Sequence, residues 1–349
     1  MANYTTSSSQ ENAILCNGLT KVYGEQTAVD HINLEIKSGS IFGLLGPNGA
    51  GKTTVIKMLT GLSKPTQGRA SVAGYDITTH SLKVKENIGW ISSEVILDDS
   101  LTIMENIWIQ AKLHSLNNTW KKKAIDLLKY LELDEKDNKR VGKFSTGMKK
   151  KLEIIMALLH DPKVLFMDEP TIGLDASSRR LLWRLIRKIN EQYGVTILLT
   201  THYIEEADAL CDDIAIINNG KIVASGSPQQ LKSRTNGDII EIDFFSYFDY
   251  KILENVSGIV EIVQIGLENT DLEKRTRSER ALRLRIKVGN AETILPELIS
   301  KITEFQPAPI INSIKIEKPN LESAFLELTG KRFEEIEEAA TATTTIDQK

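Results

Sequence analysis

The spacing of apolar residues along the first two thirds of the chain predicts strands that alternate with helices. Residues 13–36 alternate between apolar and polar positions in short runs, which is typical of half-buried strands. Three further runs are mostly apolar, as strands buried on both faces are: residues 41–45, 164–167 and 195–200. Apolar residues recur at helical spacing in four segments: residues 52–61, 102–133, 147–160 and 177–192. This alternation indicates a parallel sheet and an α/β fold, with a mostly helical subdomain at about residues 95–160.

A hairpin signal closes the first domain, and a smaller domain follows it. Asn218-Asn219-Gly220 separates the strand-like residues 214–217 and 221–224, and residues 225–237 have the composition of a linker. Beyond the linker, four segments are strand-like: residues 239–245, 259–265, 281–288 and 310–316. Two are helical: residues 291–305 and 321–328. A small α+β arrangement is expected, with a ferredoxin-like topology as one candidate.

These patterns give a domain plan for the whole chain. We expect a nucleotide-binding domain at residues 13–231 and a small α+β domain at residues 237–330. A polar start at residues 1–12 and a charged tail at residues 331–349 are expected to be disordered. The charged residues 271–280 are predicted to form a solvated hairpin loop.

Composition and charge exclude several classes of function. The net charge of -4 provides no basic field to attract nucleic acid, so we expect no nucleic-acid partner. Cys16 and Cys211 have no second cysteine or histidine at ligand spacing, so neither a zinc site nor a disulfide framework is indicated. No secretory signal and no run of roughly 18 apolar residues is present. We therefore expect a protein that stays inside the cell and reaches a membrane only through a partner.

A glycine-rich motif between a predicted buried strand and a predicted helix has the pattern of a phosphate-binding loop. The motif runs Gly46-Pro47-Asn48-Gly49-Ala50-Gly51-Lys52-Thr53 and continues into Thr54. Its glycines allow backbone N–H groups to surround phosphate oxygens at a helix N-terminus. Lys52 would place its charge between the β and γ phosphates of ATP, and the Thr53 hydroxyl would bind Mg²⁺. The alternative is a glycine-rich turn without a ligand.

Two adjacent carboxylates follow the second buried strand. Asp168 and Glu169 come directly after residues 164–167, at the carboxyl end of a strand, where parallel sheets bind ligands. Asp168 would hold Mg²⁺ through water, and Glu169 would polarise the water that attacks the γ-phosphate. The alternative is that both carboxylates only cap the turn that follows.

Four further motifs make the resemblance to a family specific. Phe144-Ser145-Thr146-Gly147-Met148 resembles the signature motif of ABC ATPases, and residues 170–175, which end at Asp175, resemble their D-loop. Thr200-Thr201-His202 resembles their switch motif, and Tyr23 resembles the aromatic residue that stacks on adenine. The order of all the motifs is the family order across residues 13–231. Residues 97–106, 148–151 and 320–330 resemble, more narrowly, the daunorubicin-resistance type of ABC-2 exporter ATPase.

The resemblance implies a fold, a mechanism and partners. The implied fold is the P-loop ABC cassette, with a mixed or parallel sheet, a helical subdomain and an antiparallel β subdomain, plus the small C-terminal domain. Two copies, or two paired nucleotide-binding subunits, would sandwich ATP. Ser145 and Gly147 of one copy would then approach the γ-phosphate held by the other, and His202 would bond that phosphate. A separate ABC-2 type permease would take an unidentified cargo across the membrane, with this chain on its cytoplasmic face.

Two residues depart from the family pattern. Ser93 stands where the family has a glutamine that contacts Mg²⁺, and Thr146 replaces a usual glycine of the signature. Serine is shorter and would need a bridging water, a neighbour such as Glu94 or a shift of the loop to do the same work. A β-branched threonine restricts the backbone. Two alternatives to a transport ATPase therefore stay open: a soluble ABC protein outside transport, and a regulatory ATP sensor with weak hydrolysis. His202 and Tyr23 could also be an ordinary loop histidine and a strand residue.

Overall fold

The computed structural model of the protein describes residues 12–94, 96–134, 139–233, 237–245, 248–265, 282–318 and 320–329. The described residues form two compact units: one runs to Pro228 and also includes Leu328 and Thr329, and the other comprises Gln229–Glu327. The expected tail, the charged residues 271–280 and the expected disordered start lie outside the described part, apart from Asn12. The sequence-based domain bounds, residues 13–231 and 237–330, stay predictions.

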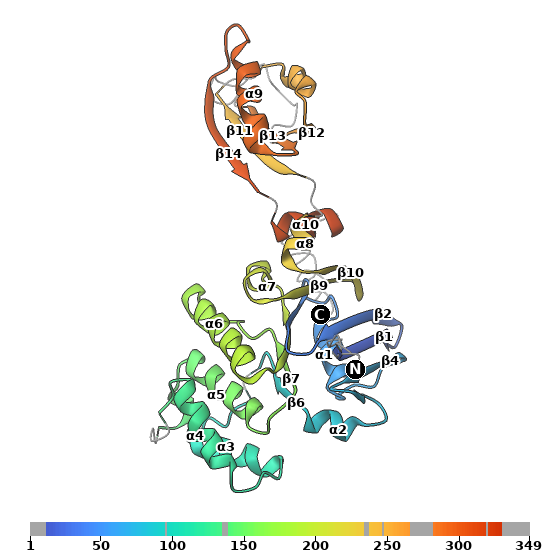
Figure 1. Cartoon of the computed structure of the whole chain (residues 1–349), viewed down its shortest axis with the longest axis vertical. Helices are drawn as coiled ribbons and strands as arrows, with labels where there is room; N and C mark the ends of the chain where they lie inside the picture. Colours follow the sequence, from blue (N-terminus) through green and yellow to red (C-terminus); the bar gives the residue numbers. More distant parts are fainter. Residues whose placement is uncertain are drawn as a thin grey trace, which may run out of the picture. The chain divides into compact units, whose positions relative to one another are not determined.

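A six-stranded sheet forms the centre of the first unit (Figure 1). Its strand order is β10-β9-β3-β8-β7-β6. The strands are β3 (Ile41–Leu45), β6 (Ile88–Ile91), β7 (Val164–Asp168), β8 (Thr196–Thr201), β9 (Asp213–Asn218) and β10 (Lys221–Gly226). All neighbours pair in parallel except β9 and β10, which form the predicted hairpin. Every residue of β3, β7 and β8 is buried, as their apolar sequences predicted.

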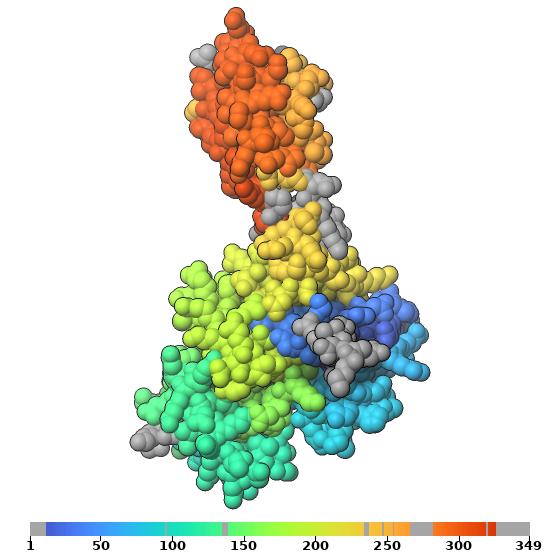
Figure 2. All heavy atoms as spheres, viewed as in Figure 1, coloured from blue at the N-terminus to red at the C-terminus, as the bar shows by residue number. Residues whose placement is uncertain are grey.

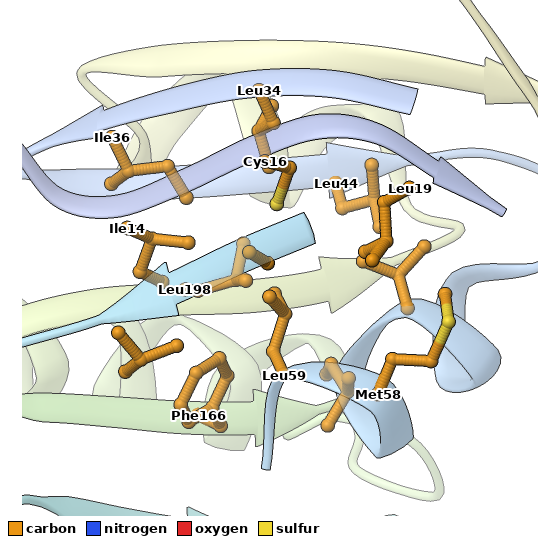
Figure 3. Close-up of a cluster of buried hydrophobic side chains, with 14 of the residues drawn as sticks. Ile14, Cys16, Leu19, Leu34, Ile36, Leu44, Met58, Leu59, Phe166 and Leu198 are labelled. Carbon is orange, nitrogen blue, oxygen red and sulfur yellow. The ribbon is translucent and has the colours of Figure 1, made fainter. Parts of the chain in front are cut away.

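A second, antiparallel sheet packs against this layer. It has the order β2-β1-β4-β5, with β1 (Asn12–Tyr23), β2 (Gln26–Lys37), β4 (Gln67–Val72) and β5 (Tyr75–Asp76). Alternate residues of β1 and β2 point into a core shared with helix α1 (Lys52–Leu59) and the central sheet (Figure 3). The predicted mixed sheet and antiparallel β part are thus confirmed. The sequence analysis did not predict β4, β5 or β6; β5 and β6 have only two and four residues, and β4 is mostly polar.

Helices cover the central sheet and form a cluster of their own. Helices α3 (Ile103–Leu113), α4 (Trp120–Tyr130) and α5 (Thr146–Leu158) lie together beside β6, which confirms the helical subdomain. The others in this unit are α2 (Ser81–Glu86), α6 (Ala176–Tyr193), α7 (Ile204–Leu210) and the 3-10 helix η1 (Val141–Lys143). Helix α8 (Pro228–Ser233) begins at the last residue before the second unit. Figure 2 shows the atoms of α3 and α4, in cyan-green, adjoining those of α5 and α6, in lighter greens.

The second unit is an antiparallel sheet with helices attached. Its strand order is β12-β13-β11-β14, from β11 (Asp238–Phe244), β12 (Ile259–Gln264), β13 (Leu282–Val288) and β14 (Ile311–Glu317). Helix α9 (Ala291–Thr303) joins β13 to β14, helix α10 (Leu321–Thr329) follows, and the 3-10 helix η2 (Tyr250–Asn255) joins β11 to β12. This order and these connections are those of a ferredoxin-like β-α-β-β-α-β unit, with η2 in the place of the first helix.

We expect Phe166→Ala to destabilise the first unit strongly. Phe166 is fully buried in the core between the two sheets, where Figure 3 labels it beside Leu198 and Leu59. Removing a buried phenyl group from a packed core costs about 3–5 kcal/mol in the free energy of unfolding. Calorimetric unfolding checks this. The control is Leu82→Ala, because Leu82 is 74% exposed and its loss should change stability by less than about 0.5 kcal/mol.

Candidate functional site

The phosphate-binding loop begins where β3 ends, and its backbone is closely fitted to its neighbours. A Cβ on Gly46 would lie 2.3 Å from the carbonyl oxygen of Ile217. Gly51 has φ of 104°, and its Cβ would lie 2.5 Å from the carbonyl oxygen of Ala28. No L side chain fits either position without a shift of backbone, so the sequence pattern and the packing agree on glycine.

Lys52 is the first residue of α1, and its amine is buried under the loop. Its Nζ donates to the carbonyl oxygens of Gly46 at 2.8 Å and Pro47 at 3.1 Å. It also forms an ion pair of 3.1 Å with Oε1 of Glu169, and the lysine side chain is 4% exposed. The charge is therefore held at the centre of the loop, beside the carboxylate that follows β7.

Asp168, the last residue of β7, joins the loop to β8. Its Oδ1 accepts a hydrogen bond of 2.5 Å from the hydroxyl of Thr200 and one of 3.3 Å from the hydroxyl of Thr53. A carboxylate and a threonine hydroxyl at this distance are hard oxygen donors, which suit Mg²⁺ bound together with phosphates and water. The donor set fits that metal, although no group of three acidic, histidine or cysteine side chains forms a protein-only metal cage among the described residues.

Glu169 is held in a strained backbone conformation between Lys52 and His202. Its φ is 48°, a region that residues other than glycine rarely occupy and that is concentrated at functional sites. Its N–H donates to the Thr200 hydroxyl at 3.0 Å, and its Oε2 lies 3.0 Å from Nδ1 of His202. The side chain is 12% exposed. The strain fixes the direction in which the carboxylate points.

The charge state of Glu169 follows from these contacts. Burial by itself would raise the pKa of the carboxyl, but the hydrogen bond to His202 and the charges of Lys52 and His202 outweigh it. The pKa therefore lies below its ordinary value, and the carboxylate is ionised at neutral pH. Because an ionised carboxylate only accepts, Nδ1 of His202 carries the proton of the bond between them.

A cavity of about 310 Å³ opens beside these groups. Seven of its lining residues were predicted from the sequence: Asn48, Gly49, Gly51, Lys52, Thr53, Thr54 and Glu169. Ala50 is buried within the same loop. The cavity lies at the carboxyl ends of β3, β7 and β8, which is where open parallel sheets bind ligands.

Five lining residues were not predicted, and they come from two hairpins. Gln26, Thr27 and Ala28 start β2, and Asn219 and Gly220 form the turn between β9 and β10. The turn has φ of 47° and 75° at its two central residues, as a type I′ turn requires, and the Gly220 N–H donates to the Ala50 carbonyl at 3.0 Å. The Asn-Gly pattern predicted the turn, but it did not predict that the turn contacts the phosphate-binding loop.

Other predicted site residues lie outside this cavity. Tyr23 ends β1 with 48% of its side chain exposed, and Nζ of Lys21 lies 4.9 Å from its ring centroid. Ser93 is exposed just after β6. Neither is among the residues that line the cavity. Their assigned contacts with adenine and Mg²⁺ stay predictions.

Three predicted residues belong to helix N-termini. Ser145 is the N-cap of α5, where its hydroxyl accepts from the Met148 N–H at 3.3 Å. Asp175 is the N-cap of α6, where it accepts from the N–H groups of Ser177 and Ser178. Gly147 lies in the first turn of α5, and a Cβ there would meet no atom within 4 Å. Ser145 and Asp175 therefore cap helices, and open space lies in front of Gly147.

Buried Glu206 on α7 supports the segment that carries His202. It has no exposed surface, and its Oε1 accepts from Nε1 of Trp183 on α6 at 2.9 Å. Burial raises the pKa of the Glu206 carboxyl above its ordinary value of 4.5, and the bond from Trp183 only partly opposes this rise. Sequence analysis could not single out this group, because a glutamate on a short helix is normally exposed.

We expect the free energy of unfolding of Glu206→Gln to increase, relative to that of the wild type, as the pH rises. The folded protein binds this proton more tightly than the unfolded chain does, so the contribution of Glu206 is full below pH 4.5 and is lost as the pH rises through the folded pKa. Glutamine keeps an acceptor for Trp183 and has no proton to lose. Thermal unfolding at pH 5 and pH 8 checks this. Parallel pH profiles for the two proteins would contradict it, and the exposed neighbour in Glu205→Gln is the control.

Comparison with known proteins decides the family. The family model described as ABC transporter matches residues 29–172. The linearmycin resistance ATP-binding protein LnrL of Bacillus subtilis is 37% identical over 317 residues, which cover 90% of this chain and 97% of that protein. The chain belongs to the ATP-binding proteins of ABC transporters. It is an ATPase of a family whose domain binds ATP, as the motifs implied.

Other relatives of this ATP-binding protein agree with the narrower resemblance. The daunorubicin resistance ATP-binding protein DrrA2 of Streptomyces coeruleorubidus is 33% identical over 93% of this chain and 97% of its own length. The structure of cbiO1 from Clostridium perfringens matches with a TM-score of 0.60 and 27% identity, over 64% of this chain and 91% of that one. A dimeric ATP-binding cassette bound to ADP and Pi matches with a TM-score of 0.55 and 27% identity. The match covers 61% of this chain and 98% of that one. Among the described residues, no helix is long and apolar enough to cross a membrane.

Proposed function

We propose that this ATPase drives export through a separate ABC-2 type permease by pairing two of its copies around ATP. One observation carries the proposal. The solved cassettes cover only 61% to 64% of this chain, whereas the match to the linearmycin resistance protein extends over 317 residues and cannot be confined to the first 228. The α+β unit is therefore part of what this chain shares with resistance proteins. No residue of the chain identifies the cargo of the proposed exporter.

Binding of ATP would use the groups that converge on the cavity. The loop N–H groups and the start of α1 would surround the phosphates, and Lys52 would turn its amine from the loop carbonyls to the β and γ phosphates. Thr53 and Asp168 would hold Mg²⁺, which would offset the charge of the triphosphate. Tyr23 would stack on the adenine from the end of β1, and Ser93 would reach the metal through a water molecule.

Hydrolysis would depend on the carboxylate of Glu169. Because its pKa is lowered, Glu169 is ionised and can accept a proton from an attacking water. The bond of 3.0 Å from His202 holds one carboxylate oxygen in place. The histidine would bond the γ-phosphate through its other ring nitrogen, so that phosphate, water and base are aligned.

A second copy would complete the site. Ser145 and Gly147 do not line the cavity of their own chain, and no described residue comes within 4 Å of a Cβ placed at position 147. Open space in front of the first turn of α5 suits the close approach of a phosphate held by another molecule. The solved cassette bound to ADP and Pi, at 27% identity, is dimeric, which supports the pairing of copies.

We expect Gly147→Asp to stop hydrolysis without weakening the fold. A Cβ at position 147 would meet no atom of the described residues within 4 Å, and an acidic residue in the first turn of a helix is favourable by about 0.3–1 kcal/mol. Against the phosphate of a second copy, the added negative charge should reduce ATP turnover about 100-fold or more. Phosphate release and thermal unfolding are measured together.

The control places the same change on another helix. Leu82→Asp occupies the same position in the first turn of α2, where Leu82 is 74% exposed, and should leave turnover unchanged. Normal turnover by Gly147→Asp would refute the pairing of copies through α5. Export itself is tested by joining the protein with its permease in vesicles, where permease-stimulated hydrolysis and cargo movement are expected to be lost together in Glu169→Gln.

A regulatory ATP sensor is the second candidate function. Ser93 and Thr146 depart from the family pattern at two positions assigned to the nucleotide, and Thr146 begins α5. ATP binding without turnover, even with the permease present, would favour the sensor over the exporter ATPase.

A further inference from the structure

A second cavity of the first unit, of about 390 Å³, lies between helices α4, α5 and α6. We call it the α4–α6 cleft. Leu174, Leu181 and Leu185 give it an apolar lining, and Leu181 is 56% exposed. Ligand cavities combine an apolar lining with a few polar groups and start at roughly 300 Å³, so this cleft has the size for a small ligand. None of these leucines lines the nucleotide cavity.

Uncompensated positive charge surrounds the apolar lining. Lys151, Arg184 and Lys188 line the cleft, and in the described part of the chain none of the three side chains forms an ion pair. Lys150 also lines it, but its amine pairs with Glu153 at 2.8 Å. Glu132 is the single acidic residue in the lining. The cleft therefore has an excess of free cations beside an exposed leucine.

This combination selects one ligand chemistry. Leucines gain free energy when an apolar chain covers them, at roughly 25 cal/mol per Å² of buried apolar surface. Unpaired lysine and arginine heads favour an anionic group, and arginine does so with a fork that fits a carboxylate. A purely polar anion would leave the leucines exposed, and a neutral chain would leave the cations unpaired.

We propose that the α4–α6 cleft binds a free amphiphilic anion, made of one alkyl chain of medium length and one acidic head group. The chain lies along Leu181 and Leu185, and the head group lies between Arg184 and Lys188. Gly147 also lines the cleft, so an occupant lies beside the residue that the proposed pairing of copies uses. Binding itself does not depend on that pairing.

The test is calorimetric titration of the full chain with decanoate, in buffer of low ionic strength and with the phosphate loop filled by ADP. We expect saturable binding at one site, weaker in 0.5 M salt because exposed charges are screened. Acetate, which has the head group alone, and decyltrimethylammonium, which has the chain with the opposite charge, should bind at least tenfold more weakly. Equal binding of either probe would overturn the proposal.

Variants locate the site. Arg184→Gln combined with Lys188→Gln should weaken decanoate binding at least tenfold, since a hydrogen bond to a charged group is worth roughly that factor or more. Leu181→Gln should weaken it about threefold or more. All three positions are exposed, so the fold should persist, which circular dichroism verifies. Lys85→Gln on α2 is the matched control and should bind as the wild type does.

Two results would reject the cleft. Unchanged affinity in the double variant would place decanoate elsewhere. Binding to vesicles of anionic phospholipid that is lost in the double variant, without binding of monomeric decanoate, would identify Arg184 and Lys188 as a membrane contact and not as a ligand site.

Discussion

Glu169→Gln is expected to abolish ATP turnover while ATP still binds. The change keeps the size of the side chain but removes the ionised oxygen that would accept the proton of the attacking water. A positioned general base contributes roughly 10²–10⁴-fold to a rate, so phosphate release should fall by at least about 100-fold. The strained backbone at residue 169 should persist, because the Thr200 hydroxyl holds it through the N–H group.

Binding of ATP should survive or improve in this variant. In the wild type, Oε1 of Glu169 lies 3.1 Å from the amine of Lys52, so the carboxylate competes with ATP for that amine. Glutamine has no charge and would not compete. Single-turnover phosphate release, equilibrium ATP binding and light scattering for ATP-dependent pairing are the three measurements. Glu205→Gln, an exposed change on α7, should behave as the wild type. Turnover within tenfold of the wild type would remove Glu169 from the role of base.

Local sequence windows were enough to predict the centre of the site. The phosphate loop, Asp168 and Glu169 each lie at the end of a run of five buried strand residues, and β3, β8 and β7 are neighbours in the sheet. Because parallel strands share their carboxyl edge, motifs separated by more than 100 residues meet there. The alternation of elements therefore predicted the fold and the sheet edge at which these motifs meet.

The remaining parts depend on contacts that no local window contains. Thr200 was visible only as a member of the switch motif, yet its hydroxyl bonds both Asp168 and the N–H of Glu169. Gln26 and Asn219 reach the cavity because two hairpins fold over the loop. The strand β4 went unpredicted because only Ala70 and Val72 of its six residues are buried, and β5 because its two residues carry no periodicity. Tyr23 had a motif-based role, and its place at the exposed end of β1 leaves that role to be tested.

The second large effect is expected for Lys52→Met, which should remove ATP binding as well as turnover. Methionine preserves most of the apolar stem but deletes the charge at the centre of the loop. A hydrogen bond to an ionised partner is worth about 1.5–3 kcal/mol, and the amine would contact two phosphates. ATP affinity should therefore fall about 100-fold or more, which titration with a fluorescent ATP analogue measures.

The loss of Lys52 should also alter the buried carboxylate beside it. Burial raises the pKa of Glu169, and His202 and Lys52 both lower it. Without the lysine charge, only His202 still offsets the effect of burial. The Glu169 pKa should rise in Lys52→Met, and the carbonyl oxygens of Gly46 and Pro47 should lose their donor. Lys57→Met, an exposed change on α1, is the control and should keep full affinity. Glu169→Gln is expected to spare ATP binding and Lys52→Met to remove it. The two variants therefore separate the two roles within the buried Lys52–Glu169 ion pair, which are proton acceptance and phosphate binding. Equal ATP affinities in both variants would show that the lysine does not contact the phosphates.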